Sequence, residues 1–234
     1  MNKVIKSFLF TSFVFSALFV VSAMSANAQG PRGEILNRMD AHNKSLNFLK
    51  SNVTMVKVDA ALGEANAETV NGSVHYIPKK GKTKMYARVD WVKPEENMIV
   101  VGDDYKIYRP TLKQGYTGKT SKAAKGNDRL AGPLGFLSMS KDELKNNYNV
   151  VIIGEATVGG GVKTMHLQMT PKTANSYKLA DLWVDGNGMP VQAKVTSNNG
   201  DTTTILLSKI EKNGTVDYGV FSFNFPAGTK VIKS

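Results

Sequence analysis

The chain of 234 residues contains no cysteine. It therefore has neither a disulfide framework nor a thiol that could carry a lipid anchor. Small secreted domains often need such cross-links, but a chain of this length can bury roughly 70% of its unfolded surface and be stable without them. The absence of cysteine thus predicts a single domain held together by a hydrophobic core.

Long hydrophobic runs are also scarce, since the sequence holds one such run, over residues 8–21. Two lysines precede this run, and Ala26-Asn27-Ala28 follows it as a small-x-small cleavage site. This order predicts a secretory signal peptide over residues 1–28 and a mature domain over residues 29–234. An uncleaved membrane anchor is the alternative, although the run is shorter than the ~20 residues that a span needs. A signal peptide on a chain without cysteine favours the bacterial periplasm.

Acidic residues are fewer than basic ones, 19 against 30, which gives a formal net charge of +11. The lysines are scattered over predicted strand faces and loops, without the exposed aromatic residues of a nucleic-acid stacking platform. We therefore expect no nucleic-acid partner. An anionic membrane surface or an acidic partner fits the charge, and a charge that only maintains solubility fits it equally well.

Recognisable catalytic motifs are missing as well. The three histidines, His42, His75 and His166, lie far apart in the sequence, and a surface position is expected for each. No nucleophile elbow, His-Glu-x-x-His motif or phosphate-binding glycine loop accompanies them. Asp181 and Asp185 precede a glycine-rich turn but lack the spacing of a calcium loop. We predict no catalytic residue, no metal site and no cofactor, and a hydrolase of lipid-like substrates is the third-ranked hypothesis.

The clearest pattern that is present is an alternation of apolar and mostly charged residues, with the apolar ones at Met85, Ala87, Val89 and Trp91. This period of two predicts a β-strand with one face toward an apolar interior. The alternation recurs along the chain, and its methionines and alanines indicate an adaptable interior. The residues predicted to line a ligand cavity are Val74, Tyr76, Met85, Ala87, Val89, Trp91, Ile99, Val101, Met165, Leu167, Met169, Leu182 and Val184. A solid core is the alternative, because any half-buried sheet requires such alternation.

Around these residues the sequence predicts a helix and many strands. Apolar residues recur at helical spacing from Pro31 to about Lys50. About a dozen short strands separated by turn residues follow, and the last of them, Val220–Phe225, directs three phenylalanines inward. This arrangement implies one large, strongly curved antiparallel sheet or barrel with the helix packed on it.

Residues 128–148 interrupt the strands and predict a helical lid. Ser140 and Glu143 form a capping box for a short helix in this insert. Glycine and proline make the preceding stretch too irregular for a strand. Its apolar residues, which we predict to cover the cavity and to compete with a ligand, are Leu130, Leu134, Phe136, Leu137 and Met139.

The order of these parts resembles the periplasmic outer-membrane lipoprotein carriers of the LolA type. The segments that carry the resemblance are Gly72–Pro78, Trp91–Pro94, Ile99–Pro110, Leu167–Pro171 and Phe223–Val231. The resemblance implies a mostly β fold with α-helices, in which an unclosed antiparallel β-barrel has an N-terminal helix and a helical lid. It also implies a carrier that binds the acyl chains of lipoproteins, or lipids, in a hydrophobic cavity and moves them toward the outer membrane.

The resemblance further implies partners and a latch. An inner-membrane release complex would load the carrier, an outer-membrane acceptor would unload it, and we expect a monomer. Where the family has an arginine that holds the lid, this chain has Lys79 and Lys80, which are possible latch residues without the planar guanidinium. Because relatives of one fold differ in function, a periplasmic sensor or regulatory module that detects lipoprotein or lipid is the alternative.

Overall fold

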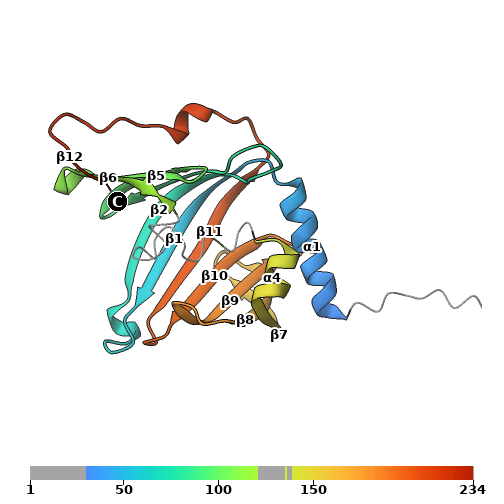
Figure 1. The fold of residues 1–234 in the computed structure, drawn as a ribbon. Helices are drawn as coiled ribbons and strands as arrows, with labels where there is room; N and C mark the ends of the chain where they lie inside the picture. Colours follow the sequence, from blue (N-terminus) through green and yellow to red (C-terminus); the bar gives the residue numbers. More distant parts are fainter. Residues whose placement is uncertain (1–29, 121–134, 136–138, 234) are drawn as a thin grey trace, which may run out of the picture.

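The computed structural model describes residues 30–120, 135 and 139–233 (Figure 1). The helices are α1 (Pro31–Ser45) and α4 (Lys141–Asn147), with short 3-10 turns η1 (Glu64–Asn66), η2 (Pro110–Leu112) and η4 (Tyr218–Phe221). The strands are β1 (Leu49–Val58), β2 (Glu68–Ile77), β3 (Tyr86–Val92), β4 (Glu95–Val101), β5 (Asp104–Arg109), β6 (Gln114–Lys119), β7 (Tyr148–Val158), β8 (Val162–Pro171), β9 (Tyr177–Asp185), β10 (Pro190–Ser197), β11 (Thr202–Lys212) and β12 (Lys230–Lys233). The predicted signal peptide, residues 1–28, lies outside the described residues. No helix within the described part of the chain is long and apolar enough to cross a membrane.

All twelve strands form one sheet in the order β12-β6-β5-β4-β3-β2-β1-β11-β10-β9-β8-β7. Neighbours are antiparallel, except that β12 joins β6 in parallel. Two meanders, β1–β6 and β7–β11, therefore meet where β1 pairs with β11. The sheet curves strongly, and its edge strands β12 and β7 do not pair with each other (Figure 1). The predicted mostly β fold, an unclosed antiparallel barrel with an N-terminal helix, is confirmed.

The two faces of the sheet bury different parts of the chain. The inner face bears Val74 and Val89, which are paired across β2 and β3, and it continues through every other residue of the neighbouring strands. Helices α1 and α4 lie beside each other over the β7–β10 part of this inner face (Figure 1). The outer face of β3–β6 is covered by the C-terminal strap, residues 213–229.

Helix α1 is shorter than the sequence pattern predicts. Pro31 occupies its first turn as expected, but the backbone is already extended at Leu46, and Leu49 begins β1. The reason is tertiary, because Asn213 at the end of β11 bonds the connecting chain. Its backbone N–H donates to the carbonyl of Phe48 over 2.8 Å. A continued helix would require a different conformation at Phe48.

A single glycine permits the close approach of α1 to the sheet. Gly188, in the β9–β10 turn, has φ +84°, and a Cβ there would lie 2.2 Å from the carbonyl oxygen of Arg38. Any side chain at this position would collide with the backbone of α1 in addition to straining the turn. Gly188 therefore sets how deeply α1 sits against the end of β9.

The predicted last strand, Val220–Phe225, is wrong. The chain forms the turn η4 there and then continues as irregular strap. Phe221 is buried against Phe48 and Ile77, and the ring of Phe225 packs against Tyr108 at 6.1 Å. These partners lie on the outer face, so the alternating phenylalanines fix the strap to the outside of the barrel rather than filling its interior.

Candidate functional site

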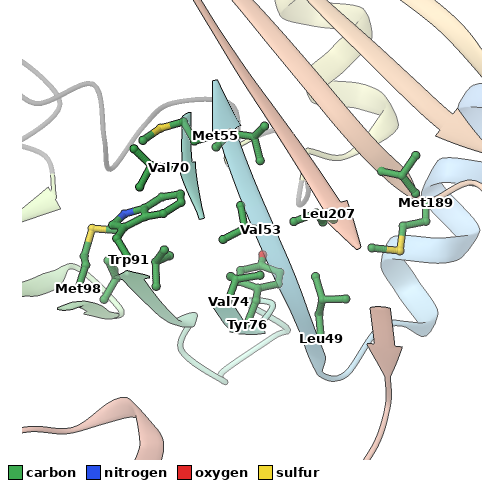
Figure 2. Packing of buried hydrophobic residues seen from close by; sticks show 14 of the residues in the cluster. Leu49, Val53, Met55, Val70, Val74, Tyr76, Trp91, Met98, Met189 and Leu207 are labelled. Carbon is green, nitrogen blue, oxygen red and sulfur yellow. The ribbon is translucent and has the colours of Figure 1, made fainter. Parts of the chain in front are cut away.

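The largest apolar cluster occupies the inner face of β1–β5 and extends to β10 and β11 through Val191, Ile205 and Leu207 (Figure 2). Six predicted cavity residues belong to it or pack against it: Val74, Tyr76, Met85, Ala87, Val89 and Trp91. They meet because Tyr76 pairs with Ala87 across β2 and β3, which places their side chains on one face. Figure 2 shows side chains of β1, β2 and β3 directed to the same side of the sheet. The sequence analysis missed the contributions of neighbouring strands, which include Val53, Met55, Met98, Val100 and Ile107.

A second apolar cluster fills the space between β7–β10 and the helices. The other predicted cavity residues that reach the inner face belong to it or pack against it: Met165, Leu167, Met169, Leu182 and Val184. Leu167, Met169 and Leu182 have no exposed surface, because Leu36 and Met39 of α1 pack with them. At this end of the sheet the side chains form a solid core with the helices.

Two predicted cavity residues lie on the wrong face. Ile99 pairs with Arg88, and Val101 with Tyr86, so both belong to the outer face. Val101 packs against the cluster of Phe221 beneath the strap. The inner residues of β4 are instead the ones that alternate with them, including Met98. The cavity prediction for Ile99 and Val101 is corrected accordingly.

A pocket of about 570 Å³ opens where α1, α4 and the β2–β3 connection meet. Leu46, Tyr76 and Met85 form its apolar wall, and the first two belong to the inner-face cluster of β1–β5. The polar part of the lining comes from three elements and comprises Asp40, Asn43, Lys44, Lys79, Lys80, Ser140 and Glu143, with Pro78 and Gly81 completing the wall. The pocket thus joins a polar mouth to the apolar inner face.

Lys79 and Lys80, the possible latch residues, both line this pocket. The ammonium group of Lys80 donates to the carbonyl of Lys44 over 2.6 Å and to the side-chain oxygen of Asn47 over 2.9 Å. These contacts fall at the end of α1, where helix carbonyls lack partners within the helix and attract a cation. Lys80 therefore connects the β2–β3 connection to the end of α1, and its role as a latch stays a prediction.

Four predicted lid residues, Leu130, Leu134, Phe136 and Leu137, lie outside the described residues. Met139 is described and packs against the cluster of α1 and α4. Its carbonyl accepts a hydrogen bond of 2.9 Å from the side chain of Asn43 in α1.

The predicted capping box that follows Met139 is confirmed. The hydroxyl of Ser140 accepts from the N–H of Glu143, whose carboxylate accepts from the N–H of Ser140. The side chain of Lys141 donates to that of Asn37 in α1. The C-terminal part of the predicted lid, residues 139–148, is therefore fixed to α1.

A buried ion pair lies at the other end of the inner face and was missed by the sequence analysis. Glu96 is 2% exposed and accepts a hydrogen bond of 2.6 Å from Nε of Arg109. This bond raises the pKa of Arg109, whose guanidinium also lies 5.0 Å from the ring centre of Tyr116. The sequence does contain a signal for this pair: Glu96 lies two residues before apolar Met98 in β4, so the two side chains share the inner face. The pair gives the apolar face a polar boundary opposite the pocket.

The three histidines occupy separate environments. His42 is buried in α1, so its predicted surface position is wrong. Burial lowers its pKa most, Lys212 lowers it further, and Asp185 acts in the opposite direction. His75 stacks on Phe48, and burial lowers its pKa too. His166 bonds Asp181 over 2.8 Å on the outer face. Among the described residues, no three His, Asp or Glu side chains are grouped as metal ligands.

Solved structures share this fold at low sequence identity. An uncharacterized conserved protein from Thermus thermophilus is 11% identical, with 88% of this chain and 100% of that chain covered and a TM-score of 0.54. The structure of MucB is 15% identical, with 86% of this chain and 64% of that chain covered and a TM-score of 0.53. A LolA superfamily protein from Nitrosomonas europaea is 14% identical, with coverages of 81% and 96% and a TM-score of 0.40. The similarity to the first two structures shows a shared fold, and a shared fold does not by itself indicate a shared function.

The family relationship is seen in the sequence itself. No curated protein matches the chain. The sequence model of one family, described as outer membrane lipoprotein carrier protein LolA, matches residues 64–224. This range spans most of the described sheet, from η1 to the strap, and more than half of the 234 residues. The chain therefore belongs to the LolA family of outer membrane lipoprotein carrier proteins.

Proposed function

We propose that this protein is a periplasmic carrier that binds acyl chains of lipoproteins, or lipids, and moves them toward the outer membrane. The observation that carries the proposal is the continuity of the pocket with the inner face, since Leu46 and Tyr76 belong to both. Its volume of about 570 Å³ is in the range of small-molecule sites, roughly 300–1,000 Å³. An acyl chain entering there meets aliphatic and aromatic side chains, while its head group stays at the polar mouth.

The energetics favour carriage with assisted release. Burying an acyl chain contributes about 0.8 kcal/mol per methylene, so a sixteen-carbon chain gains on the order of 10 kcal/mol. Spontaneous release of such a ligand into water would be slow. We propose that a monomer receives cargo from an inner-membrane release complex and yields it to an outer-membrane acceptor. The apolar residues of the lid insert would compete with the ligand during this exchange.

A charge placed on the apolar wall of the pocket tests the proposal. Met85 is half-buried and lines the pocket, so Met85→Glu should remove at least nine tenths of the bound lipid, because a carboxylate resists contact with an alkyl chain. Val92→Glu is the matched control, since Val92 lies on the outer face of β3, at the end of that strand far from Met85, and is 63% exposed. Lipid would be extracted from both purified variants and quantified by mass spectrometry.

The control should retain its lipid, and both variants should keep the circular dichroism spectrum of the parent. Equal lipid content in the two variants would contradict binding in this pocket. A stable complex with an inner-membrane signalling protein, without transfer of lipid to acceptor vesicles, would replace the carrier with a sensor of the same fold.

A further inference from the structure

The β2–β3 connection is unusually basic. Residues 79–84 hold four lysines, and we call this segment the lysine loop. Lys79, Lys82 and Lys84 are exposed, whereas Lys80 is half-buried and bonded to the end of α1. In the described part of the chain, no hydrogen bond or ion pair involves the ammonium groups of Lys79, Lys82 and Lys84. Three uncompensated positive charges therefore project from this loop.

The neighbours of the lysine loop do not cancel this charge. Lys44 forms an ion pair of 2.7 Å with Asp40 at the mouth of the pocket, which leaves Asp40 unavailable to the loop. The adjacent β4–β5 turn carries Asp103 and Asp104, and Asp104 is paired with Lys119 over 2.7 Å. Asp103 and Glu143 also lie near the loop, and Glu143 is bonded within the capping box. Among the described residues, neither carboxylate forms an ion pair with a lysine of the loop.

The two connections at the ends of β2 differ in charge. At the opposite end of β2, the β1–β2 connection over residues 59–67 contains Asp59 and Glu64 and no lysine. This difference favours an approach of β2 to a negatively charged surface with the lysine loop first.

An exposed aromatic side chain stands next to the loop. Tyr218 is 57% exposed, and its ring meets Tyr86 edge-on at 5.5 Å, two residues beyond Lys84. Tyrosine with lysine is the combination that favours the boundary between lipid head groups and acyl chains. Lysine, a mobile point charge, also suits a fluid array of phosphates better than a fixed carboxylate partner.

We propose that the lysine loop, with Tyr218, is the surface through which this protein docks on an anionic phospholipid membrane. Lys79 and Gly81 also line the pocket, so docking through the loop brings the polar mouth of the pocket to the lipid surface. This inference extends the proposed function, because a carrier must bring its pocket to a membrane to exchange an acyl chain. It concerns docking only and holds for any cargo.

Vesicle flotation of the mature chain tests the docking surface. Wild-type protein should bind vesicles of phosphatidylcholine with 30% phosphatidylglycerol, lose binding in 0.5 M NaCl, and bind pure phosphatidylcholine weakly. The triple variant Lys79→Gln, Lys82→Gln, Lys84→Gln should bind the anionic vesicles roughly 100-fold more weakly, since each lysine contributes about fivefold. Lys93→Gln, Lys163→Gln, Lys178→Gln is the control, because these three lysines are exposed, lie outside the loop and lower the net charge equally.

The control triple should bind within threefold of wild type. Equal losses in the two triples would show that net charge alone drives binding and would overturn the proposal. Absence of wild-type binding to the anionic vesicles would also overturn it, and capture of an acidic protein partner in their place would assign the loop to that partner. The double variant Lys82→Gln, Lys84→Gln leaves the pocket lining intact. It should keep the lipid content of wild type while binding the anionic vesicles roughly 25-fold more weakly, so a failure of docking is distinguishable from a failure of lipid binding.

Discussion

Individual residues show how burial and charge are balanced on the inner face. Glu96 would be costly to bury alone, because a carboxylate loses its hydration there. Arg109 compensates that loss while its own side chain keeps 29% exposure. Removal of Arg109 therefore leaves a buried carboxylate, whereas removal of Glu96 leaves a guanidinium that water can reach.

This asymmetry predicts unequal effects of single substitutions. Arg109→Met should lower the free energy of unfolding by about 3–5 kcal/mol, because it removes the bond of the guanidinium to a carboxylate that is only 2% exposed. Glu96→Gln should cost less, about 1.5–3 kcal/mol, because water can reach the guanidinium that remains. Urea unfolding at pH 7 measures both values. Equal losses, or the reverse order, would show that the pair does not stabilise the inner face as described.

His42 predicts a dependence of stability on pH. Its folded-state pKa lies below the model-peptide value of 6.5 because of burial, so the unfolded chain binds the proton more readily. Its contribution to stability is therefore complete above about pH 6.5 and is lost as the pH falls toward the folded-state pKa.

The variant His42→Gln should show a shallower loss of melting temperature between pH 7 and pH 5 than wild type. Because the pKa of His75 is also lowered by burial, His75→Gln should flatten part of the remaining slope. Thermal scans at a series of pH values measure the slopes. An unchanged slope in His42→Gln would place the pH dependence elsewhere in the protein.

At the level of elements, the contact of α1 with the β9–β10 turn sets how closely α1 packs on the second apolar cluster. Gly188→Ala should lower the free energy of unfolding by about 1–3 kcal/mol through strain at positive φ. The steric clash of the new Cβ with the Arg38 carbonyl should lower it further. Gly186→Ala is the matched control two residues earlier, since a Cβ there meets nothing within 4 Å. Denaturant melts of the two variants compare the sites, and similar losses would mean that α1 does not pack against Gly188.

The elements also show where sequence patterns succeed. Alternation along β3 predicts its inner residues correctly, because the other face of that strand carries polar side chains such as Arg88 and Asp90. Along β4 the run from Met98 to Val101 is apolar on both faces, so periodicity gives no direction. The outer face of β4 is apolar because the strap covers it, and that contact spans more than a hundred residues of sequence.

The candidate site follows the same logic. Lys79 and Lys80 could be assigned to one site from the sequence, because the family resemblance indicates a latch after β2. The end of α1 could not be predicted, since Asn213 fixes the chain there from the far end of β11. The pocket depends on where α1 ends, so its polar mouth was also beyond prediction.

At the scale of the whole molecule, the sheet combines two environments on one inner face. The half under α1 and α4 is a solid core that supports the fold, with Leu167 and Leu182 fully buried. The half formed by β1–β5 continues into the pocket beside Tyr76. The edge strands of this sheet, β12 and β7, are not joined to each other. Structural core and proposed ligand site are thus adjacent parts of one sheet.

Native mass spectrometry of the protein purified from its native host measures whether the pocket and inner face hold an acyl chain. We expect a population heavier than the polypeptide by the mass of a lipid or lipoprotein, released as an alkyl-bearing fragment on collisional activation. A single species at the polypeptide mass, which also fails to take up an offered diacyl lipid, would contradict it.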